Sequence, residues 1–316
     1  MSTTILVTDT YLTESLEKLR HALNPCEIVR TDRRPSAAEL ARADGLLIRS
    51  RTVVDAELLA QAPKLKVVVS ATSGYDHVDA ELCAQKNIAA LYTPDANAPA
   101  AAELTLLLML SCLRRQTEAQ RALRNREWKD ALKFGAELSG KTVGIIGLGR
   151  VGSRVARLTQ CFGATVVAHD PYQKDDVFRS FNLERFGFSE VLAQADILSL
   201  HVPLNDETRH FINQRTLEQA KDGVILINTS RGSVVDERAL IASLDSGEVS
   251  AAGLDVFETE PLAAESRLRK FSNVVITPHM GAFTNEAMAR ASDLAVNALI
   301  AALVSGERSN PIPIES

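Results

Sequence analysis

GKTVGIIGLGRVGSRVARLTQCFGATVVAHD, residues 140–170, is the stretch that decides the fold of this chain. The apolar, β-branched run at 142–146 predicts a buried strand, because it is too short to form a helix of its own. Three glycines follow at G-x-G-x-x-G spacing, and apolar residues then recur at helical intervals from Val151. A second apolar run, 165–168, leads to Asp170. The pattern therefore predicts a strand, a glycine turn, a helix and a second strand.

The three glycines suit a turn that binds a dinucleotide. Gly147 permits a tight turn, Gly149 lets the backbone approach a pyrophosphate, and Gly152 lets the helix pack close to the strand. The N-terminus of the helix offers N–H groups and a positive dipole end to the phosphates. Asp170 lies 23 positions after Gly147, where an acid accepts hydrogen bonds from the ribose hydroxyls. The alternative is a glycine turn in an ordinary βα unit that binds no ligand.

Composition limits the class of protein. The 316 residues suggest about two domains, and 46% hydrophobic with 24% charged residues is ordinary for a soluble globular chain. A net charge of −5 offers no basic field for nucleic acid or an anionic membrane. The four cysteines form no C-x-x-C pair, so neither a metal site nor a disulfide framework is expected. No targeting segment or bilayer-spanning run is recognised, so a cytoplasmic location is the expectation.

Strand-like and helix-like segments alternate from residue 5 and again from Lys141. This alternation predicts parallel sheets covered by helices on both faces. Between the two series, residues 100–128 carry one long helical pattern, which predicts a single helix bridging two domains. A final helical run, 286–304, is suited to carry the chain back to the first domain.

Three loops that follow strand-like runs carry reactive side chains: Arg231 in NTSRG, Glu260 in ETEP and His279 in TPHMG. Ligands of open α/β sheets bind at the carboxyl ends of the strands, which predicts a shared site. Arginine binds a carboxylate through two hydrogen bonds, and histidine exchanges a proton near neutral pH. A carboxylate beside the histidine favours imidazolium and fixes its tautomer. The alternatives are a structural arginine, a solvated glutamate and an ordinary loop histidine.

Longer motifs around these residues resemble the D-2-hydroxyacid dehydrogenase family, most closely its phosphoglycerate dehydrogenase branch. The matching segments are ELSGKTVGIIGLGRVGSRVA, NTSRGSVVDERAL, GLDVFETEP, NVVITPHMGAFTNEA, LLIRSRTVV, SATSGYDHVD and NAPAAAELTLLLML. The resemblance implies an α/β fold of two doubly wound parallel-sheet domains. A Rossmann NAD-binding domain, 98–284, is then inserted into a flavodoxin-like substrate domain formed by 1–97 and 285–316.

The resemblance also implies an enzyme that transfers a hydride between NAD and C2 of a D-2-hydroxyacid or 2-oxo acid. His279 would exchange the hydroxyl proton, Glu260 would hold the imidazole, and Arg231 would bind the carboxylate. The expected cofactor-binding residues are Gly147, Gly149, Arg150, Val151, Gly152, Asp170, His201, Val202, Pro203, Thr229, Ser230, Asp255, His279 and Gly281. The expected substrate-binding residues are Arg49, Ser50, Ser73, Gly74, Asn97, Arg231 and His279.

The substrate is less closely defined by the resemblance. Arg49 matches an arginine that phosphoglycerate dehydrogenases place near the substrate phosphate, whereas Ser70 stands where many relatives carry a second arginine. Because of Arg49, D-3-phosphoglycerate, from which serine biosynthesis starts, is expected as substrate. Glyoxylate/hydroxypyruvate reductase and 4-phosphoerythronate dehydrogenase are the alternatives, and an NAD-binding corepressor is the alternative outside enzymes. A homodimer is expected from the resemblance, and so is a short form without a C-terminal regulatory domain.

Overall fold

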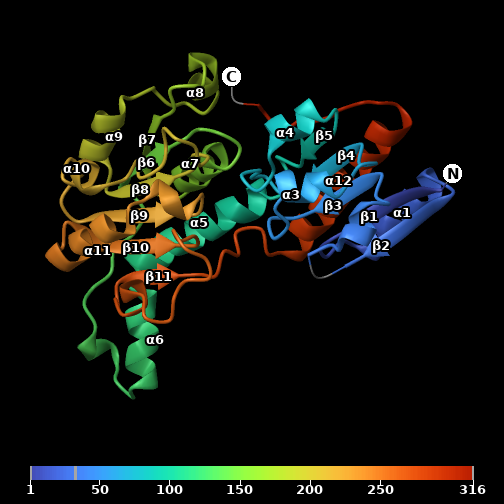
Figure 1. The fold of residues 1–316 in the computed structure, drawn as a ribbon. Helices are drawn as coiled ribbons and strands as arrows, with labels where there is room; N and C mark the ends of the chain where they lie inside the picture. The colour runs from blue at the N-terminus through green and yellow to red at the C-terminus, as the bar shows by residue number, and fades with distance from the viewer. Residues whose placement is uncertain (1, 32–33, 315–316) are drawn as a thin grey trace. The chain divides into compact units, whose positions relative to one another are not determined.

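The computed structural model describes residues 2–31 and 34–314. The chain divides into two compact units. Unit 1 comprises Met1–Ala98 and Ala282–Ser316, and unit 2 comprises Pro99–Gly281 (Figure 1). The boundaries expected from the sequence, after residues 97 and 284, lie within three residues of these. The assignment of unit 1 to the substrate stays a prediction.

Unit 1 is built on a five-stranded parallel sheet of order β2-β1-β3-β4-β5, the flavodoxin-like order. Its strands are β1 (Thr3–Val7), β2 (Cys26–Arg30), β3 (Gly45–Ile48), β4 (Val67–Ser70) and β5 (Ala89–Tyr92). The inner strands β3 and β4 are buried along their whole length, as expected for strands covered on both faces. The order reverses between β1 and β3, so a crevice is expected at the carboxyl ends of these two strands.

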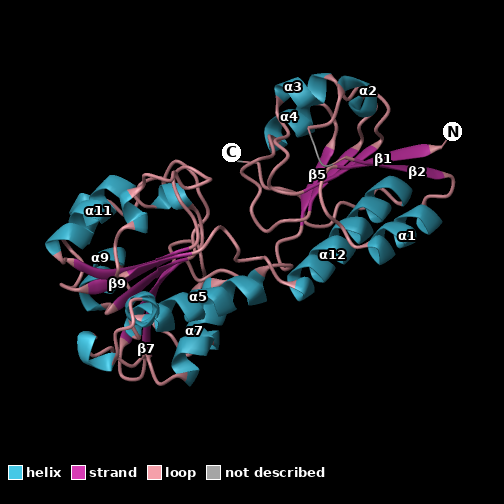
Figure 2. Cartoon of the chain, turned by 90° about the horizontal axis from the view of Figure 1, so that it is seen from below, coloured by secondary structure: helices cyan, strands magenta, loops and turns pink. Residues whose placement is uncertain are grey.

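Helices cover both faces of the unit 1 sheet (Figure 2). The helices on one face are α1 (Thr13–Ala22) and α12 (Asn285–Val304). Those on the other face are α2 (Ala37–Leu40), α3 (Ala56–Ala60) and α4 (Ala80–Gln85). Thus the C-terminal helix packs into the core of the N-terminal sheet.

Within the described part of the chain, α12 is the one helix long and apolar enough to cross a membrane by length and composition. Its inner face, including Ala291, Ala295 and Leu299, is fully buried against the unit 1 sheet. We therefore interpret α12 as a core helix, since such helices pass the same test.

Unit 2 is built on a six-stranded parallel sheet of order β11-β10-β9-β8-β6-β7. A parallel bridge between Ala168 and Arg185 adds a minimal further strand beside β7. Counted with that bridge, the order is that of a Rossmann sheet with one additional strand, so the expected fold class is confirmed. The strands are β6 (Thr142–Ile146), β7 (Thr165–His169), β8 (Ile197–Leu200), β9 (Val224–Asn228), β10 (Val249–Leu254) and β11 (Val274–Ile276).

Two hydrophobic clusters fill the two sides of the unit 2 sheet. The helices on one side are α5 (Ala98–Leu113), α7 (Gly152–Cys161) and α8 (Asp175–Ser180). Those on the other side are α9 (Phe188–Gln194), α10 (Gln214–Leu217) and α11 (Glu237–Ser246). Short 3₁₀ turns occupy Lys129–Ala131 (η1), Gly232–Val234 (η2) and Arg267–Arg269 (η3).

The single bridging helix expected over 100–128 is wrong. The chain forms two helices there, α5 and α6 (Gln116–Arg124), separated by Arg115 in the left-handed conformation with φ of 51°. The Leu113 carbonyl accepts a hydrogen bond from the Ala136 N–H at 2.9 Å. The end of α5 therefore finds its partner in a distant segment, a competitor that local helical periodicity cannot report.

Candidate active site

The carboxyl ends of the unit 2 strands gather most of the expected site residues. The glycine turn follows β6, Asp170 follows β7, and His201, Val202 and Pro203 follow β8. Thr229, Ser230 and Arg231 follow β9, Asp255 and Glu260 follow β10, and His279 and Gly281 follow β11. All six strands are parallel, so these loops share one edge of the sheet.

His279 and Glu260 form a direct pair. His279 Nδ1 lies 2.6 Å from Glu260 Oε2, and the other carboxylate oxygen accepts the Phe257 N–H at 3.1 Å. His279 has φ of 50°, and its N–H donates to the Asp255 carbonyl at 2.8 Å. Because Nδ1 is engaged by the carboxylate, Nε2 is the ring nitrogen left to exchange a proton.

The pair shifts the pKa values of both members toward the charged forms. The hydrogen bond to Glu260 raises the pKa of His279 above its ordinary value, against the effects of burial and of the Arg231 charge. Burial alone would raise the pKa of Glu260, but the hydrogen bond and charge of His279 hold it below its ordinary value. The geometry thus stabilises an imidazolium–carboxylate pair.

Arg231 is fixed by the loop that follows β9. The Asn228 side-chain amide donates to the Arg231 carbonyl at 2.9 Å, and Asn228 Oδ1 accepts the Ser230 N–H at 3.0 Å. The guanidinium donates to the Ser230 carbonyl at 2.8 Å. Its charge acts on both His279 and Glu260, which brings the three expected catalytic side chains into one electrostatic group.

Asp255 braces the histidine loop, a role that sequence reasoning missed. This residue is 1% exposed. Its carboxylate accepts the Thr277 hydroxyl at 2.6 Å and the N–H groups of Met280 and Gly281, each at 2.8 Å. Burial raises its pKa. In the sequence, the signal for such a brace is an aspartate directly after a buried strand. The expected approach of Asp255 to the cofactor stays a prediction.

Packing within the chain requires two of the three glycines in the turn, Gly147 and Gly152, but not Gly149. At Gly147, with φ of 91°, a β-carbon would lie 2.6 Å from the His201 carbonyl oxygen. At Gly152 it would lie 2.0 Å from the Gly147 carbonyl oxygen. At Gly149 a β-carbon would meet no atom within 4 Å. The described chain gives no packing reason for Gly149, and open space at this position is what close approach of a pyrophosphate to the backbone requires.

Asp170 is tied to the glycine turn. Its Oδ2 accepts the Leu148 N–H at 2.8 Å, while Oδ1 accepts the N–H groups of Tyr172 at 2.9 Å and Gln173 at 3.2 Å. The Tyr172 hydroxyl bonds to Glu207, which links the loops after β7 and β8. Asp170 therefore holds the glycine turn, and its expected contact with a ribose stays a prediction.

His201 is unsuited to proton transfer. Its Nε2 lies 2.8 Å from the buried Ser199 hydroxyl, and burial lowers the pKa of the ring to about 3. The cofactor-lining role expected for His201 stays a prediction. Thr229, at the neighbouring strand end, bonds Thr105 of α5 at 2.8 Å between hydroxyls. Arg150 and Val151 lie at the turn that starts α7.

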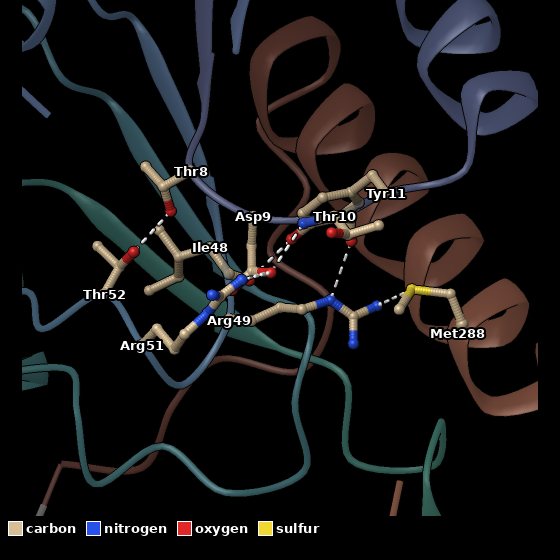
Figure 3. Close-up of polar contacts among 9 residues, drawn as sticks. All are labelled: Thr8, Asp9, Thr10, Tyr11, Ile48, Arg49, Arg51, Thr52 and Met288. Carbon is tan, nitrogen blue, oxygen red and sulfur yellow. Dashed lines mark hydrogen bonds and ion pairs between the residues drawn. The ribbon is translucent and has the colours of Figure 1, made fainter. Parts of the chain in front are cut away.

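In unit 1, Arg49 and Ser50 follow β3 at the point where the strand order reverses. Arg49 Nε donates to the Thr10 carbonyl at 3.2 Å, and its Nη2 lies 2.9 Å from Met288 Sδ (Figure 3). The guanidinium lies 5.5 Å from the centre of the Tyr11 ring. Arg49 is thus held in place by unit 1 itself.

Arg51, two residues further on, points toward Asp9 in Figure 3, with 2.8 Å between Nη2 and Oδ1. The Asp9 side chain is 7% exposed, whereas that of Arg51 is 72% exposed. The carboxylate of Asp9 therefore lies beside Arg51, two residues after Arg49, near the carboxyl ends of β1 and β3.

The other expected substrate contacts lie near β4 and β5. The Ser73 hydroxyl donates to the Pro94 carbonyl at 3.1 Å, and the Gly74 carbonyl accepts the Thr72 hydroxyl at 2.7 Å. Ser70 is buried, with its hydroxyl 2.6 Å from that of Thr72 and 2.8 Å from His77 Nε2.

Asn97 is distinguished by an unsatisfied oxygen. Its Oδ1 is buried and has no hydrogen-bond partner among the described residues. Buried polar atoms are normally bonded, so this oxygen is a candidate ligand contact. The described residues contain no group of three His, Cys, Asp or Glu side chains that could hold a metal ion.

Known proteins resemble this chain in sequence and in fold. The model of the NAD-binding domain of the D-isomer specific 2-hydroxyacid dehydrogenases matches residues 106–281. A D-3-phosphoglycerate dehydrogenase of Mycobacterium leprae (strain TN) is 45% identical over 260 residues, which cover 82% of this chain and 49% of the relative. A hydroxypyruvate reductase of Thermotoga maritima is 42% identical over 253 residues, which cover 79% of this chain and 82% of the relative.

The crystal structure of a D-lactate dehydrogenase from Aquifex aeolicus, complexed with NAD and lactic acid, superposes with a TM-score of 0.84. That structure is 29% identical, and the match covers 96% of each chain. The present chain spans about half the length of the phosphoglycerate dehydrogenase it matches.

Proposed function

Because the chain belongs to the D-isomer specific 2-hydroxyacid dehydrogenase family and contains its NAD-binding domain, we propose that it interconverts a D-2-hydroxyacid and a 2-oxo acid with NAD(H). The 2.6 Å contact between His279 Nδ1 and Glu260 Oε2 carries this proposal. That contact leaves Nε2 to exchange a proton, while Arg231 supplies a fixed positive charge nearby.

Each residue has a role in the reaction that its contacts support. When bound, NADH would supply a hydride to C2 of the 2-oxo acid in reduction, and NAD+ would accept it from C2 of the hydroxyacid in oxidation. His279 Nε2 donates a proton to the 2-oxo oxygen in reduction and takes the hydroxyl proton in oxidation. Glu260 stabilises the imidazolium form, and Arg231 binds the substrate carboxylate and polarises the 2-oxo group. Gly149, where a β-carbon meets no atom within 4 Å, would leave room for the pyrophosphate, and Asp170 would accept hydrogen bonds from the ribose hydroxyls.

As the specific reaction we propose the interconversion of D-3-phosphoglycerate and 3-phosphohydroxypyruvate, which would place the chain in serine biosynthesis. Arg49 supports this choice, since it stands at the carboxyl end of β3 with its guanidinium held by unit 1. Ser73 and Gly74 would bind the substrate carboxylate, and Asn97 would contact the substrate through its unsatisfied oxygen.

Reduction of hydroxypyruvate or glyoxylate is the second candidate, and a specific observation favours it. Position 70 carries an uncharged serine, which therefore offers no second cation to a phosphate. Its side chain is buried and its hydroxyl is hydrogen bonded to Thr72 and His77. The hydroxypyruvate reductase relative is also matched over most of its own length.

The test is steady-state oxidation of NADH with 3-phosphohydroxypyruvate, hydroxypyruvate, glyoxylate and pyruvate. The highest kcat/KM is expected with 3-phosphohydroxypyruvate. A higher value with hydroxypyruvate or glyoxylate would select the second candidate. Binding of NADH without turnover of any substrate would contradict the enzyme proposal and favour a corepressor-like protein.

We also propose a homodimer with a cytoplasmic location. The segment after α6 exposes large apolar side chains, Trp128 at 67% and Phe134 completely, as surfaces that associate commonly do. Sedimentation velocity should give twice the chain mass. A monomer at micromolar concentration would contradict the proposal.

A further inference from the structure

A second cluster of titratable groups lies beside the loop that carries Glu260. The Glu258 N–H donates to Glu237 Oε1 at 2.6 Å, and the Glu237 N–H donates to Glu258 Oε1 at 3.0 Å. His210 Nε2 lies 3.0 Å from the same Oε1 of Glu258. We call these three residues, His210, Glu237 and Glu258, the 258 clasp.

The two partners of Glu258 are fixed by backbone contacts. His210 has φ of 50°, its N–H donates to the Ser233 carbonyl at 2.8 Å, and its carbonyl accepts the Asn213 side-chain amide at 2.8 Å. Glu237 is the first residue of α11, directly after the capping residue Asp236. Glu258 therefore binds a rigid frame made of a helix start and a tight turn.

The clasp brings two carboxylates close together. Glu237 and Glu258 face one another, and burial together with the Glu258 charge raises the pKa of Glu237. The positive end of the α11 dipole lies at these two adjacent carboxylates, and the His210 ring lies within hydrogen-bond distance of Glu258 Oε1. Loss of His210 would leave the two carboxylates opposed without the imidazole.

The clasp and the active-site pair are joined by one short loop. Glu258 and Glu260 are two residues apart, and Phe257 between the clasp and β10 donates its N–H to Glu260 Oε1. A β-carbon at Gly232 would lie 1.9 Å from the Phe257 carbonyl carbon, so this loop also touches the backbone next to Arg231. A shift of Glu258 would therefore move Glu260 relative to His279.

We propose that Glu258, held by His210 and Glu237, is a positioning residue that aligns Glu260 with His279. The inference rests on the proposed function, since the alignment matters to turnover only if His279 transfers the proton. The 2.6 Å contact between Glu260 and His279 is short enough for a small loop displacement to weaken it.

Two variants weaken the clasp in different ways. His210→Asn removes the imidazole, and asparagine tolerates the positive φ at this position. Glu258→Gln keeps an oxygen that can accept the Glu237 N–H but removes the charge facing His210. Asp245→Asn is the matched control, because it removes a carboxylate of α11 that pairs with Arg267 outside the clasp.

The first readout is the titration of the His279 ring, followed by NMR and assigned through the signal lost in His279→Ala. The groups that act on this ring are Glu260, Arg231 and Asp255, none of which is changed in the clasp variants. Both variants should lower the His279 titration midpoint by about 0.5–1 pH unit, because the carboxylate partner is misaligned. Asp245→Asn should leave it unchanged.

The second readout is kinetic. Both clasp variants should lower kcat about 3- to 30-fold with KM for NADH nearly unchanged, since a displaced proton donor impairs chemistry and not cofactor binding. An unchanged His279 midpoint in both variants would overturn the proposal, even if their melting temperatures fell, because the clasp would then be only structural. Absence of turnover in the native protein would contradict the proposed function alone, and the NMR titration would still decide the role of the clasp.

Discussion

A β-carbon at position 232 would lie 1.9 Å from the carbonyl carbon of Phe257, so Gly232 and Phe257 touch backbone to backbone. Gly232 follows Arg231, and Phe257 precedes Glu260 by three residues. This contact holds the arginine loop and the glutamate loop together and makes glycine obligatory where they meet.

Gly232→Ala should therefore reduce both stability and activity. The added methyl group forces the two loops apart, and overpacking of this kind costs about 1–3 kcal/mol. Thermal unfolding should show a melting temperature lower by several degrees, and kcat should fall in the remaining folded protein. A variant with the native melting temperature and kcat would show that the loops relax at no cost.

Gly149→Ala should behave in the opposite way, because no atom of the chain lies within 4 Å of its β-carbon. The melting temperature should stay within about 1 °C of the native value. The dissociation constant for NADH, measured by fluorescence titration, should rise about 10- to 100-fold, because the methyl group enters the space for the pyrophosphate. Unchanged NADH affinity would show that the pyrophosphate does not bind at this turn.

Glu260→Gln should shift the pH dependence of 2-oxo acid reduction to lower pH. Reduction needs protonated His279, so the rate falls as pH rises through the pKa of that histidine, which Glu260 raises. Without the carboxylate charge the pKa drops, and the decline begins at lower pH. His279→Ala is the reference variant and should lower kcat by about 10²–10⁴-fold at every pH with NADH binding retained. An unshifted profile in Glu260→Gln would show that the pair does not control the proton donor.

Arg49→Ala should discriminate between phosphorylated and unphosphorylated substrates. A charge-assisted contact to a phosphate is worth enough to raise KM for 3-phosphohydroxypyruvate about 10-fold or more, while KM for hydroxypyruvate changes little. Arg42→Ala removes an exposed ion pair with Glu27 elsewhere in unit 1 and serves as the control. Equal changes with both substrates would mean that Arg49 does not bind the phosphate.

Asp170 should select NADH over NADPH, because a 2′-phosphate would meet a like charge on an acceptor-only group. The structure shows that Asp170 also holds the Leu148 N–H, so Asp170→Ala disturbs the glycine turn as well. Asp170→Asn keeps an acceptor oxygen and removes the charge. The ratio of kcat/KM for NADH to that for NADPH should fall about 10-fold or more in both variants. A native ratio near one would exclude Asp170 as the selecting residue.

Local sequence was sufficient for the elements that depend on neighbouring residues. The strand, glycine turn, helix and acid of 140–170 form as expected, and Gly247 ends α11 in the left-handed conformation. The prediction of one long helix failed at Arg115. There α5 ends, and the Leu113 carbonyl accepts a hydrogen bond from Ala136, 23 residues further along the chain. Helical periodicity describes one face of a segment and contains no information about such a distant competitor.

The sequence by itself determined the two α/β units, the dinucleotide turn and the loops that carry Arg231, Glu260 and His279, because these follow from residue spacing and backbone preference. Only the tertiary structure decided which side chains meet. The register of β9, β10 and β11 brings His279 to Glu260 and to the Asp255 brace. The segment after β8, bound to the Ser233 carbonyl through the His210 N–H, likewise brings His210 to Glu258, a partner 48 positions away. Hydrogen bonds act over about 3 Å, so contacts between loops of different strands exist only once the parallel sheet has fixed their distances.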